Sequence, residues 1–158
     1  MPDWTWKSNE IHEEEVVIFD LDGVISDATH RQHFLKQKKR KWDEFFRSCP
    51  ADPPLPAGVT LLKLISNSKN IVILTARPVS IHRETLDWLE AQNISWDALI
   101  MRSEEDPMPS SEMKRLALNQ IREAGFLPVL ALDDDPRNID MYKEEQIPTI
   151  YVYSGYYE

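Results

Sequence analysis

Five short runs of apolar residues recur along the chain, and their length and composition suit buried strands. Each run spans four or five residues, mostly aliphatic or β-branched, with no charged residue inside it. Continuous apolar runs of this length are typical of strands covered on both faces of a sheet. We predict strands over residues 16–19, 71–74, 98–101, 128–132 and 149–153.

Stretches with the apolar spacing of amphipathic helices separate these runs. An alternation of strands and helices is typical of a parallel sheet with helices on both faces, joined by right-handed crossovers. We therefore expect an α/β fold with about five parallel strands, formed by a single domain over residues 1–158. The predicted helices cover residues 57–66, residues 80–92 with Ser80 as the N-cap, residues 111–123 closed by Gly125, and residues 136–145 with Asp135 as the N-cap.

The stretch from residue 26 to residue 56 interrupts this alternation directly after the first strand. Residues 27–47 predict one or two short helices with an aromatic stripe. Residues 49–56 include four prolines, so we expect no regular structure there. We expect residues 26–56 to form a small helical cap insertion beside the end of the first strand.

A dense basic run, Lys36–Lys41, lies inside this insertion. Most charge runs are solvated linkers, and this is one explanation of the run. The alternative is that the lysines overhang the site and attract a phosphate-bearing ligand, which would make binding sensitive to salt. The sequence leaves both explanations open.

The charge balance and the lone cysteine narrow the classes of function. A formal net charge of −9 argues against broad coating of nucleic acid and against adhesion to anionic membranes. Cys49 has no partner for an internal disulfide, and no apolar run approaches the length of a signal peptide or a membrane span. We expect a soluble, cytoplasmic protein that meets any polyanionic substrate locally.

Polar residues gather where the predicted strands end. Carboxyl ends of parallel strands meet at one edge of a sheet, which is where ligands bind in open α/β folds. A lysine in the first turn of the predicted 111–123 helix is disfavoured by the helix dipole unless an anion faces it. The residues at this edge are Asp20 and Asp22 after the first strand, Thr75 and Arg77 after the second, Lys114 in the helix, and Asp133 and Asp134 after the fourth strand.

The glycine positions exclude a glycine-rich phosphate-binding loop, and the clustered carboxylates favour a Mg²⁺ site. The chain has four glycines, and none forms a Walker loop or a dinucleotide fingerprint. Clustered carboxylate oxygens suit Mg²⁺, and a carboxylate attacks phosphorus once a cation, a lysine and backbone amides neutralise the phosphoryl oxygens. The sequence therefore indicates Mg²⁺-dependent phosphoryl chemistry.

Four ordered segments resemble the motifs of haloacid dehalogenase (HAD)-like phosphohydrolases, over residues 16 to about 153. They are Phe19–Val24, Leu74–Pro78, Lys114 and Leu132–Asp134. The resemblance implies a HAD-like Rossmannoid fold and a phosphoric monoester hydrolase. Val24 departs from the pattern, because the family most often has threonine there, and this removes a hydroxyl from the turn.

The resemblance implies a role for each motif residue. Asp20 would be the nucleophile and Asp22 the general acid and base. Thr75 and the amide of Ala76 would hold phosphoryl oxygens, and Lys114 would fix the nucleophile. Mg²⁺ would be bound by Asp20, the backbone carbonyl of Asp22, Asp134 and, in an assisting role, Asp133.

A narrower resemblance concerns the substrate. Four segments are similar to the 3′-phosphatase domain of phage polynucleotide kinase: Leu130–Asp134, Asn138–Tyr142, Ser154–Tyr156 and Thr75–Arg77. This implies removal of 3′-phosphates from nucleic-acid ends in repair, with Arg77, Arg102 and Gly23 among the substrate-binding residues together with Ala76.

Other functions stay open on the sequence. A 5′-nucleotidase or a small-molecule phosphatase of the same superfamily would use the same motifs. A receiver-like switch phosphorylated on aspartate lacks an acid two residues beyond its acceptor, so Asp22 argues against it. A silent partner protein would use Trp4 and Trp6, which could otherwise pack on the rim of the sheet.

Overall fold

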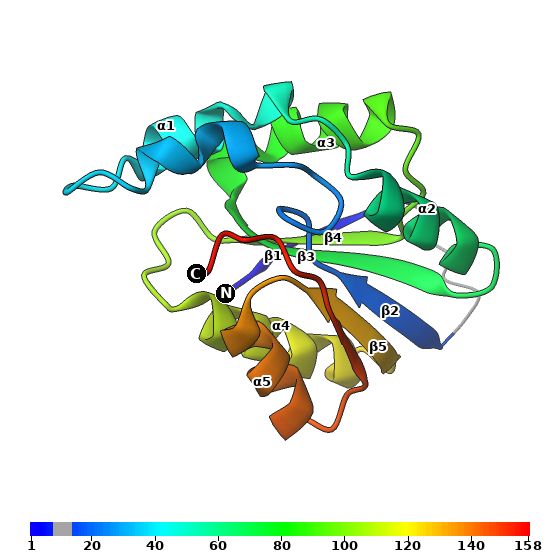
Figure 1. Cartoon of the computed structure of the whole chain (residues 1–158). Helices are drawn as coiled ribbons and strands as arrows, with labels where there is room; N and C mark the ends of the chain where they lie inside the picture. Colours follow the sequence, from blue (N-terminus) through cyan, green and yellow to red (C-terminus); the bar gives the residue numbers. More distant parts are fainter. Residues whose placement is uncertain (8–13) are drawn as a thin grey trace.

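A computed structural model describes residues 1–7 and 14–158 of the chain, and its centre is one twisted sheet (Figure 1). The sheet has six strands in the order β1-β4-β3-β2-β5-β6. Apart from β1, neighbouring strands are parallel. The strands are β1 (Asp3–Trp6), β2 (Glu15–Phe19), β3 (Asn70–Pro78), β4 (Ala98–Arg102), β5 (Leu127–Asp133) and β6 (Thr149–Tyr151).

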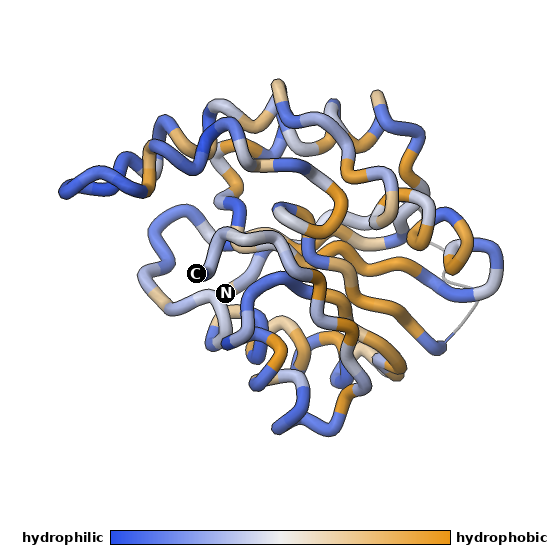
Figure 2. The backbone as a smooth tube through the Cα atoms, in the orientation of Figure 1, coloured by the Kyte–Doolittle hydropathy of each residue, from blue (hydrophilic) through white to orange (hydrophobic). Residues whose placement is uncertain are grey.

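The alternation of side chains along β2 explains the two layers of core. Val17 and Phe19 belong to one hydrophobic cluster and Val16 and Ile18 to the other, because successive residues of a strand point to opposite faces. Figure 2 shows hydrophobic residues concentrated along the central strands. The predicted parallel α/β fold, with helices on both faces, is confirmed.

Five α-helices are found among the described residues. Helices α2 and α3 lie on one side of the sheet, and α4 and α5 lie on the other (Figure 1). None of the helices in the described part of the chain is both long enough and apolar enough to cross a bilayer. The helices are α1 (Trp42–Arg47), α2 (Pro56–Ile65), α3 (His82–Ala91), α4 (Ser110–Glu123) and α5 (Pro136–Glu144).

Strand β1 was not predicted. It is a four-residue edge strand that runs antiparallel to β4, and its first residue pairs with Met101. Trp4 stacks on Trp6 with ring centroids 5.3 Å apart, and the Trp4 indole N–H donates to Gln120 at 2.8 Å. Backbone pairing and aromatic contacts across the fold create this strand, so its short sequence shows no pattern of its own. The tryptophans pack on the rim of the sheet.

Two predicted helix caps have different outcomes. The Asp135 side chain accepts a hydrogen bond from the Arg137 N–H at 2.9 Å, so that N-cap is confirmed. The Ser80 cap is wrong, because residues 79–81 form a short 3₁₀ turn, η3 (Val79–Ile81), and α3 begins at His82. The Ser80 N–H donates to Glu104 instead.

The cap segment, residues 26–56, connects β2 with α2. It contains two 3₁₀ turns, η1 (Thr29–Phe34) and η2 (Cys49–Ala51), with α1 between them. Figure 1 shows that α1 and the loop before it extend on the side to which the carboxyl ends of the parallel strands point. The cap segment therefore lies beside the edge where the polar residues were expected.

Candidate active site

Three carboxylates from two neighbouring strands meet at the carboxyl edge of the sheet. Asp20 directly follows β2, Asp133 ends β5, and Asp134 comes next. The Asp20 N–H donates to the carbonyl of Leu132 at 2.9 Å, which holds the two strand ends side by side. One oxygen from each carboxylate lies within 4.8 Å of the others, and all three residues are buried. The expected acidic cluster is present.

Lys114 lies between two of these carboxylates. It is 1% exposed and sits in the first turns of α4. Its Nζ donates to Asp20 Oδ1 at 3.0 Å and to Asp133 Oδ2 at 2.7 Å. A lysine near the start of a helix is unfavourable in the helix dipole unless an anion faces it, and Asp20 and Asp133 are the predicted anions.

The cluster carries more negative charge than Lys114 offsets. Burial and the charge of Asp133 raise the pKa of Asp20 well above its usual value, although Lys114 opposes the change. Burial also raises the pKa of Asp134, to about 6. Within the described residues, neither carboxylate oxygen of Asp134 has a hydrogen-bond partner. Buried acceptors without donors are costly, and a hard divalent cation with oxygen ligands fits this arrangement.

Asp133 is held by protein donors on both oxygens. Oδ1 accepts from the Asp135 N–H at 3.0 Å and from the Asn138 amide at 3.1 Å, while Oδ2 accepts from Lys114. Asp133 therefore fixes Lys114 and the start of α5. Asn138 is a site residue that the sequence analysis did not single out, and its position in the first turn of the helix that follows Asp133 was the available signal.

Gly23 allows Asp134 to approach the turn after β2. Its φ is +84°, and a Cβ added to it would lie 2.1 Å from Asp134 Oδ2. No other residue type fits such a contact without displacing the carboxylate. The Gly23 N–H donates to the Ser26 carbonyl at 2.8 Å. The Gly23 amide therefore has a partner within the protein, and the expected substrate-binding role of Gly23 stays a prediction.

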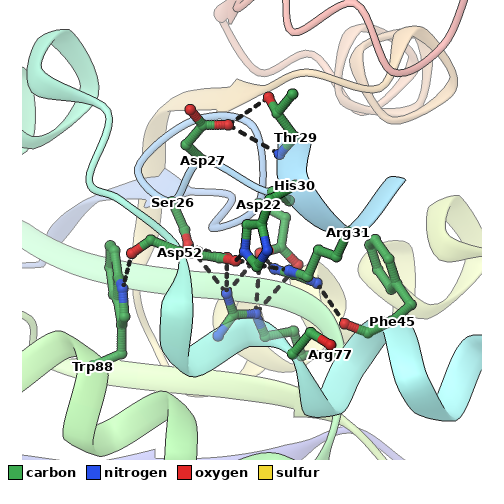
Figure 3. Close-up of polar contacts among 12 residues, drawn as sticks. Asp22, Ser26, Asp27, Thr29, His30, Arg31, Phe45, Asp52, Arg77 and Trp88 are labelled. Carbon is green, nitrogen blue, oxygen red and sulfur yellow. Dashed lines mark hydrogen bonds and ion pairs between the residues drawn. The ribbon is translucent and has the colours of Figure 1, made fainter. Parts of the chain in front are cut away.

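Asp22 is fixed by two arginines (Figure 3). Arg77 Nη2 and Arg31 Nη2 donate to Asp22 Oδ1 at 2.6 and 2.7 Å, and Arg77 Nε lies 3.2 Å from Oδ2. Burial raises the pKa of Asp22, but the two guanidinium charges outweigh it and lower the pKa to about 2. The Asp22 side chain keeps 21% of its surface exposed. This carboxylate is thus clamped through both oxygens and still keeps part of its surface exposed.

A second carboxylate, Asp52, completes the arginine cluster from the cap segment. It accepts from Arg31 Nε at 2.8 Å and from Arg77 Nη2 at 3.3 Å, and its backbone carbonyl accepts from the Trp88 indole at 2.8 Å. The Ser26 hydroxyl donates to it at 2.6 Å. Figure 3 shows the two arginines between Asp22 and Asp52. These contacts join the cap segment to β3 and α3.

Sequence reasoning missed Arg31 and Asp52. Arg31 stands just before the basic run and Asp52 stands among prolines, so each has an ordinary local explanation. Both side chains are fully buried or nearly so. Only the fold shows that they face each other, and no local pattern in the chain could have indicated it.

Thr75 and Ala76 lie at the same edge, near the end of β3. Thr75 is buried, and its hydroxyl oxygen accepts from the Arg77 N–H at 3.1 Å. The parallel register pairs Phe19 with Ile73, which brings Asp20 level with the residue before Thr75. The structure therefore brings Thr75 and the acidic cluster together.

Arg77 and Arg102, both expected to bind a nucleotide phosphate, make contacts within the protein. Arg77 has no exposed surface, and its donors go to Asp22, Ser26, Asp52 and Thr85. Arg102 donates to the carbonyls of Ala76, Asp106 and Met108, which ties the loop after β4 to β3. The Arg77 guanidinium is thus occupied by the protein through all three nitrogens, whereas Arg102 stays partly exposed, and its contact with a phosphate remains a prediction.

Several solved structures share this fold. The chain superposes on Pnkp1 from the Pnkp1/Rnl/Hen1 complex with a TM-score of 0.74 and 20% identity, covering 94% of this chain and 48% of that one. The chain thus spans about half the length of Pnkp1. A class C acid phosphatase from Bacillus anthracis with tungstate bound gives a TM-score of 0.65 and 17% identity, with 93% and 69% coverage of the two chains.

A third structure, a haloacid dehalogenase-like hydrolase from Streptococcus pneumoniae, gives a TM-score of 0.61 and 17% identity, with 86% and 83% coverage. At these identities the likeness shows the shared fold. No curated protein matches the chain. The family model described as the polynucleotide kinase PNKP phosphatase domain matches residues 14–157, almost the whole chain. The chain therefore belongs to this family of phosphatase domains, and its fold is the one shared by HAD-like hydrolases.

Proposed function

We propose that the protein is a Mg²⁺-dependent phosphomonoesterase that acts through an aspartyl phosphate on Asp20 and removes 3′-phosphates from nucleic-acid ends. The observation that carries the proposal is the position of Lys114, between Asp20 and Asp133 and next to an Asp134 carboxylate without donors. A nucleophilic carboxylate needs such a cation, because a phosphate monoester is itself an anion.

The residues present fit a Mg²⁺ ion. Asp20, Asp134 and the backbone carbonyl of Asp22 would hold it, with Asp133 in an assisting position behind Lys114. When bound, the ion supplies positive charge to the phosphoryl oxygens. Thr75 and the Ala76 amide would hold these oxygens at the end of β3.

The first step would transfer the phosphoryl group to Asp20. The Asp20 oxygen bonds to phosphorus while the bond from phosphorus to the ester oxygen breaks, and Asp22 gives its proton to the departing oxygen. Lys114 keeps Asp20 oriented and offsets the charge that gathers on the phosphoryl group. In the second step, water gives a proton to Asp22, its oxygen bonds to phosphorus, and the Asp20–phosphorus bond breaks.

The two arginines bias Asp22 toward one of these roles. They favour the ionised carboxylate, which is the form that accepts the proton from water. Giving a proton in the first step requires the protonated form, and the negative charge of a phosphate ester bound nearby favours that form. The clamp also holds Asp22 in one orientation for both steps.

Two observations support a nucleic-acid end as the substrate. The family model is named for a polynucleotide kinase phosphatase domain, and the Pnkp1 chain comes from a complex described as an RNA repair complex. The exposed run Lys36–Lys41 projects on the carboxyl side of the sheet, where it would meet the backbone of a bound strand (Figure 2). A small phosphate ester or a nucleotide is the alternative substrate.

A phosphate-release assay tests this function. We expect Mg²⁺-dependent release from 3′-phosphorylated oligonucleotides, much less from 5′-phosphorylated ones or from mononucleotides, and none in EDTA. Asp20→Asn should abolish release, because an amide is a poor nucleophile, while Asp22→Asn should let phosphoenzyme form slowly and block its hydrolysis. Full activity of Asp20→Asn would disprove the mechanism, and equal rates on all three substrates would disprove the substrate assignment.

A further inference from the structure

The C-terminal segment, residues 152–158, is rich in tyrosine and runs beside the site. Four of the five tyrosines of the chain lie within residues 151–158. None of the steps proposed above uses them. A cluster of exposed aromatic side chains often marks a binding surface. The position of these tyrosines relative to the carboxylates is therefore informative.

Contacts at its start and in its middle fix the path of the C-terminal segment. At its start, the Val152 N–H donates to the Asp133 carbonyl at 2.9 Å. In its middle, Ser154 packs against the Gly23 turn, where an added Gly23 Cβ would come 3.1 Å from Ser154 Cβ. Figure 1 shows the segment in red, passing in front of the sheet toward the cap segment.

Tyr156 attaches the far end of the C-terminal segment to the cap segment. Its hydroxyl accepts from the Ala28 N–H at 2.9 Å and lies 3.3 Å from Asp27 Oδ1. The segment is therefore held at both ends, on β5 and on the cap segment. Tyr157 follows directly after this attachment point, so its ring has a defined place at the rim of the site.

Tyr157 combines an exposed ring with a position beside the start of α5, the helix that follows Asp133 and Asp134. The residue keeps 48% of its surface exposed. Its ring centre lies 5.7 Å from the Arg137 guanidinium, in the first turn of α5. Burial and the negative charges of Asp134, Asp20 and Asp135 raise the pKa of the Tyr157 hydroxyl.

We propose that Tyr157 is a stacking surface for the nucleobase of the nucleotide whose 3′-phosphate is removed. This inference rests on the proposed function and makes it more specific: the preferred substrate is a single-stranded 3′ end whose terminal base is free to leave the stack. A base-paired end would have to open before its base could reach the ring.

The chemistry of the rim favours a base over other partners for this ring. A nucleotide bound by its phosphate at Asp20 carries its sugar and base outward, past the residues that border the cluster. A planar aromatic ring accepts any of the bases, because each has a π-face, whereas it discriminates poorly among small aliphatic esters. The Arg137 guanidinium lies over one face of the ring and is ion-paired with Asp135 at 2.9 Å, so a base would stack on the other face.

The test compares two 3′-phosphorylated oligonucleotides that differ in the terminal base. One ends in an ordinary nucleotide and the other in an abasic tetrahydrofuran nucleotide, and kcat/KM is measured for both with Mg²⁺. The wild type should prefer the base-bearing end by about tenfold, which is the scale of one stacked base. The ratio within each variant is the readout, so a general loss of activity cancels.

Three variants locate the effect. Tyr157→Ala should bring the ratio to about one, whereas Tyr157→Phe keeps the ring and should keep the preference. Trp6→Ala is the matched control, since Trp6 is 40% exposed and lies on β1, at the opposite edge of the sheet from β6. It should leave the ratio at the wild-type value.

Each result has one meaning. A wild-type ratio near one, or a preference that survives Tyr157→Ala, overturns the stacking role while leaving the proposed function intact. Absence of hydrolysis of both 3′-phosphorylated oligonucleotides, with glycerol phosphate still hydrolysed, overturns the proposed function and the stacking role with it.

Discussion

At the scale of single residues, the site depends on how closely Gly23 and Asp134 approach. The turn after β2 brings a backbone without a side chain against a buried carboxylate that has no donor of its own. A residue with a Cβ would occupy the volume of the Asp134 oxygen. The position of Asp134, a candidate Mg²⁺ ligand, therefore depends on residue 23 having no Cβ atom.

Gly23→Ala tests this contact. We expect kcat/KM to fall by about 10- to 100-fold, since Asp134 must move and the affinity for Mg²⁺ drops with it. The concentration of Mg²⁺ that gives half-maximal rate should rise in parallel. Phosphate release measured across a Mg²⁺ titration gives both quantities.

Gly125→Ala is the matched control. Gly125 also has a positive φ, +93°, but a Cβ there meets nothing within 4 Å. The variant should lose about 1–2 kcal/mol of stability from backbone strain alone and keep its Mg²⁺ dependence. If both variants changed the Mg²⁺ dependence equally, strain and not contact with Asp134 would be the cause.

At the scale of elements, the arginine cluster joins the cap segment to the sheet. Two carboxylates, the buried Asp52 and the partly exposed Asp22, balance two buried guanidinium groups, Arg31 and Arg77. Buried ion pairs add little net stability when intact, but removing one member leaves an uncompensated charge. The attachment of the cap segment therefore depends on the charge of Asp52, the fully buried carboxylate that pairs with both Arg31 and Arg77.

Asp52→Asn tests the balance, because it keeps the shape of the side chain and removes its charge. We expect the free energy of unfolding to fall by about 3–5 kcal/mol, measured by urea denaturation. Asp27→Asn is the control in the same segment. Its carboxylate is hydrogen-bonded to Thr29 at the surface, and its loss should change stability by less than about 0.5 kcal/mol. Equal effects would mean that the buried charges do not hold the segment.

The basic loop Lys36–Lys41 is a second element with a testable role. Lys38→Ala/Lys39→Ala should raise KM for a 3′-phosphorylated oligonucleotide but not for glycerol phosphate. The slope of log kcat/KM against log salt should flatten by about 1.4, because each lost contact with a single strand accounts for about 0.7.

The control for the loop removes two exposed lysines elsewhere, Lys63→Ala/Lys143→Ala, and so changes the net charge equally. It should leave the salt slope at the wild-type value. A similar flattening in both variants would indicate that net charge matters and the position of the loop does not.

At the scale of the whole molecule, apolar runs and their alternation with helical spacing were enough to predict the parallel sheet and both helix layers. The ends of the strands also predicted that Asp20, Asp133, Asp134 and Lys114 would meet, because parallel register brings strand ends to one edge. These features follow from local patterns that repeat along the chain.

The features that were missed depend on contacts between distant parts of the chain. Strand β1 forms because β4 offers it a backbone partner, and its four residues show no pattern alone. Arg31 and Asp52 are 21 positions apart and become partners only once the cap segment folds over β3. Burial of a charged residue is set by tertiary packing, which a single sequence does not display.

The arginine cluster has a consequence for how substrate enters. Because buried ion pairs fix the cap segment to β3, we expect the opening above the carboxylates to keep the same width throughout turnover. We expect the backbone amides of η1, α1 and η2 to exchange with deuterium at the same rates with and without Mg²⁺ and orthovanadate. Slower exchange across all three on binding would reveal a closing movement. An opening of constant width would admit the end of a long nucleic-acid strand without closing around it.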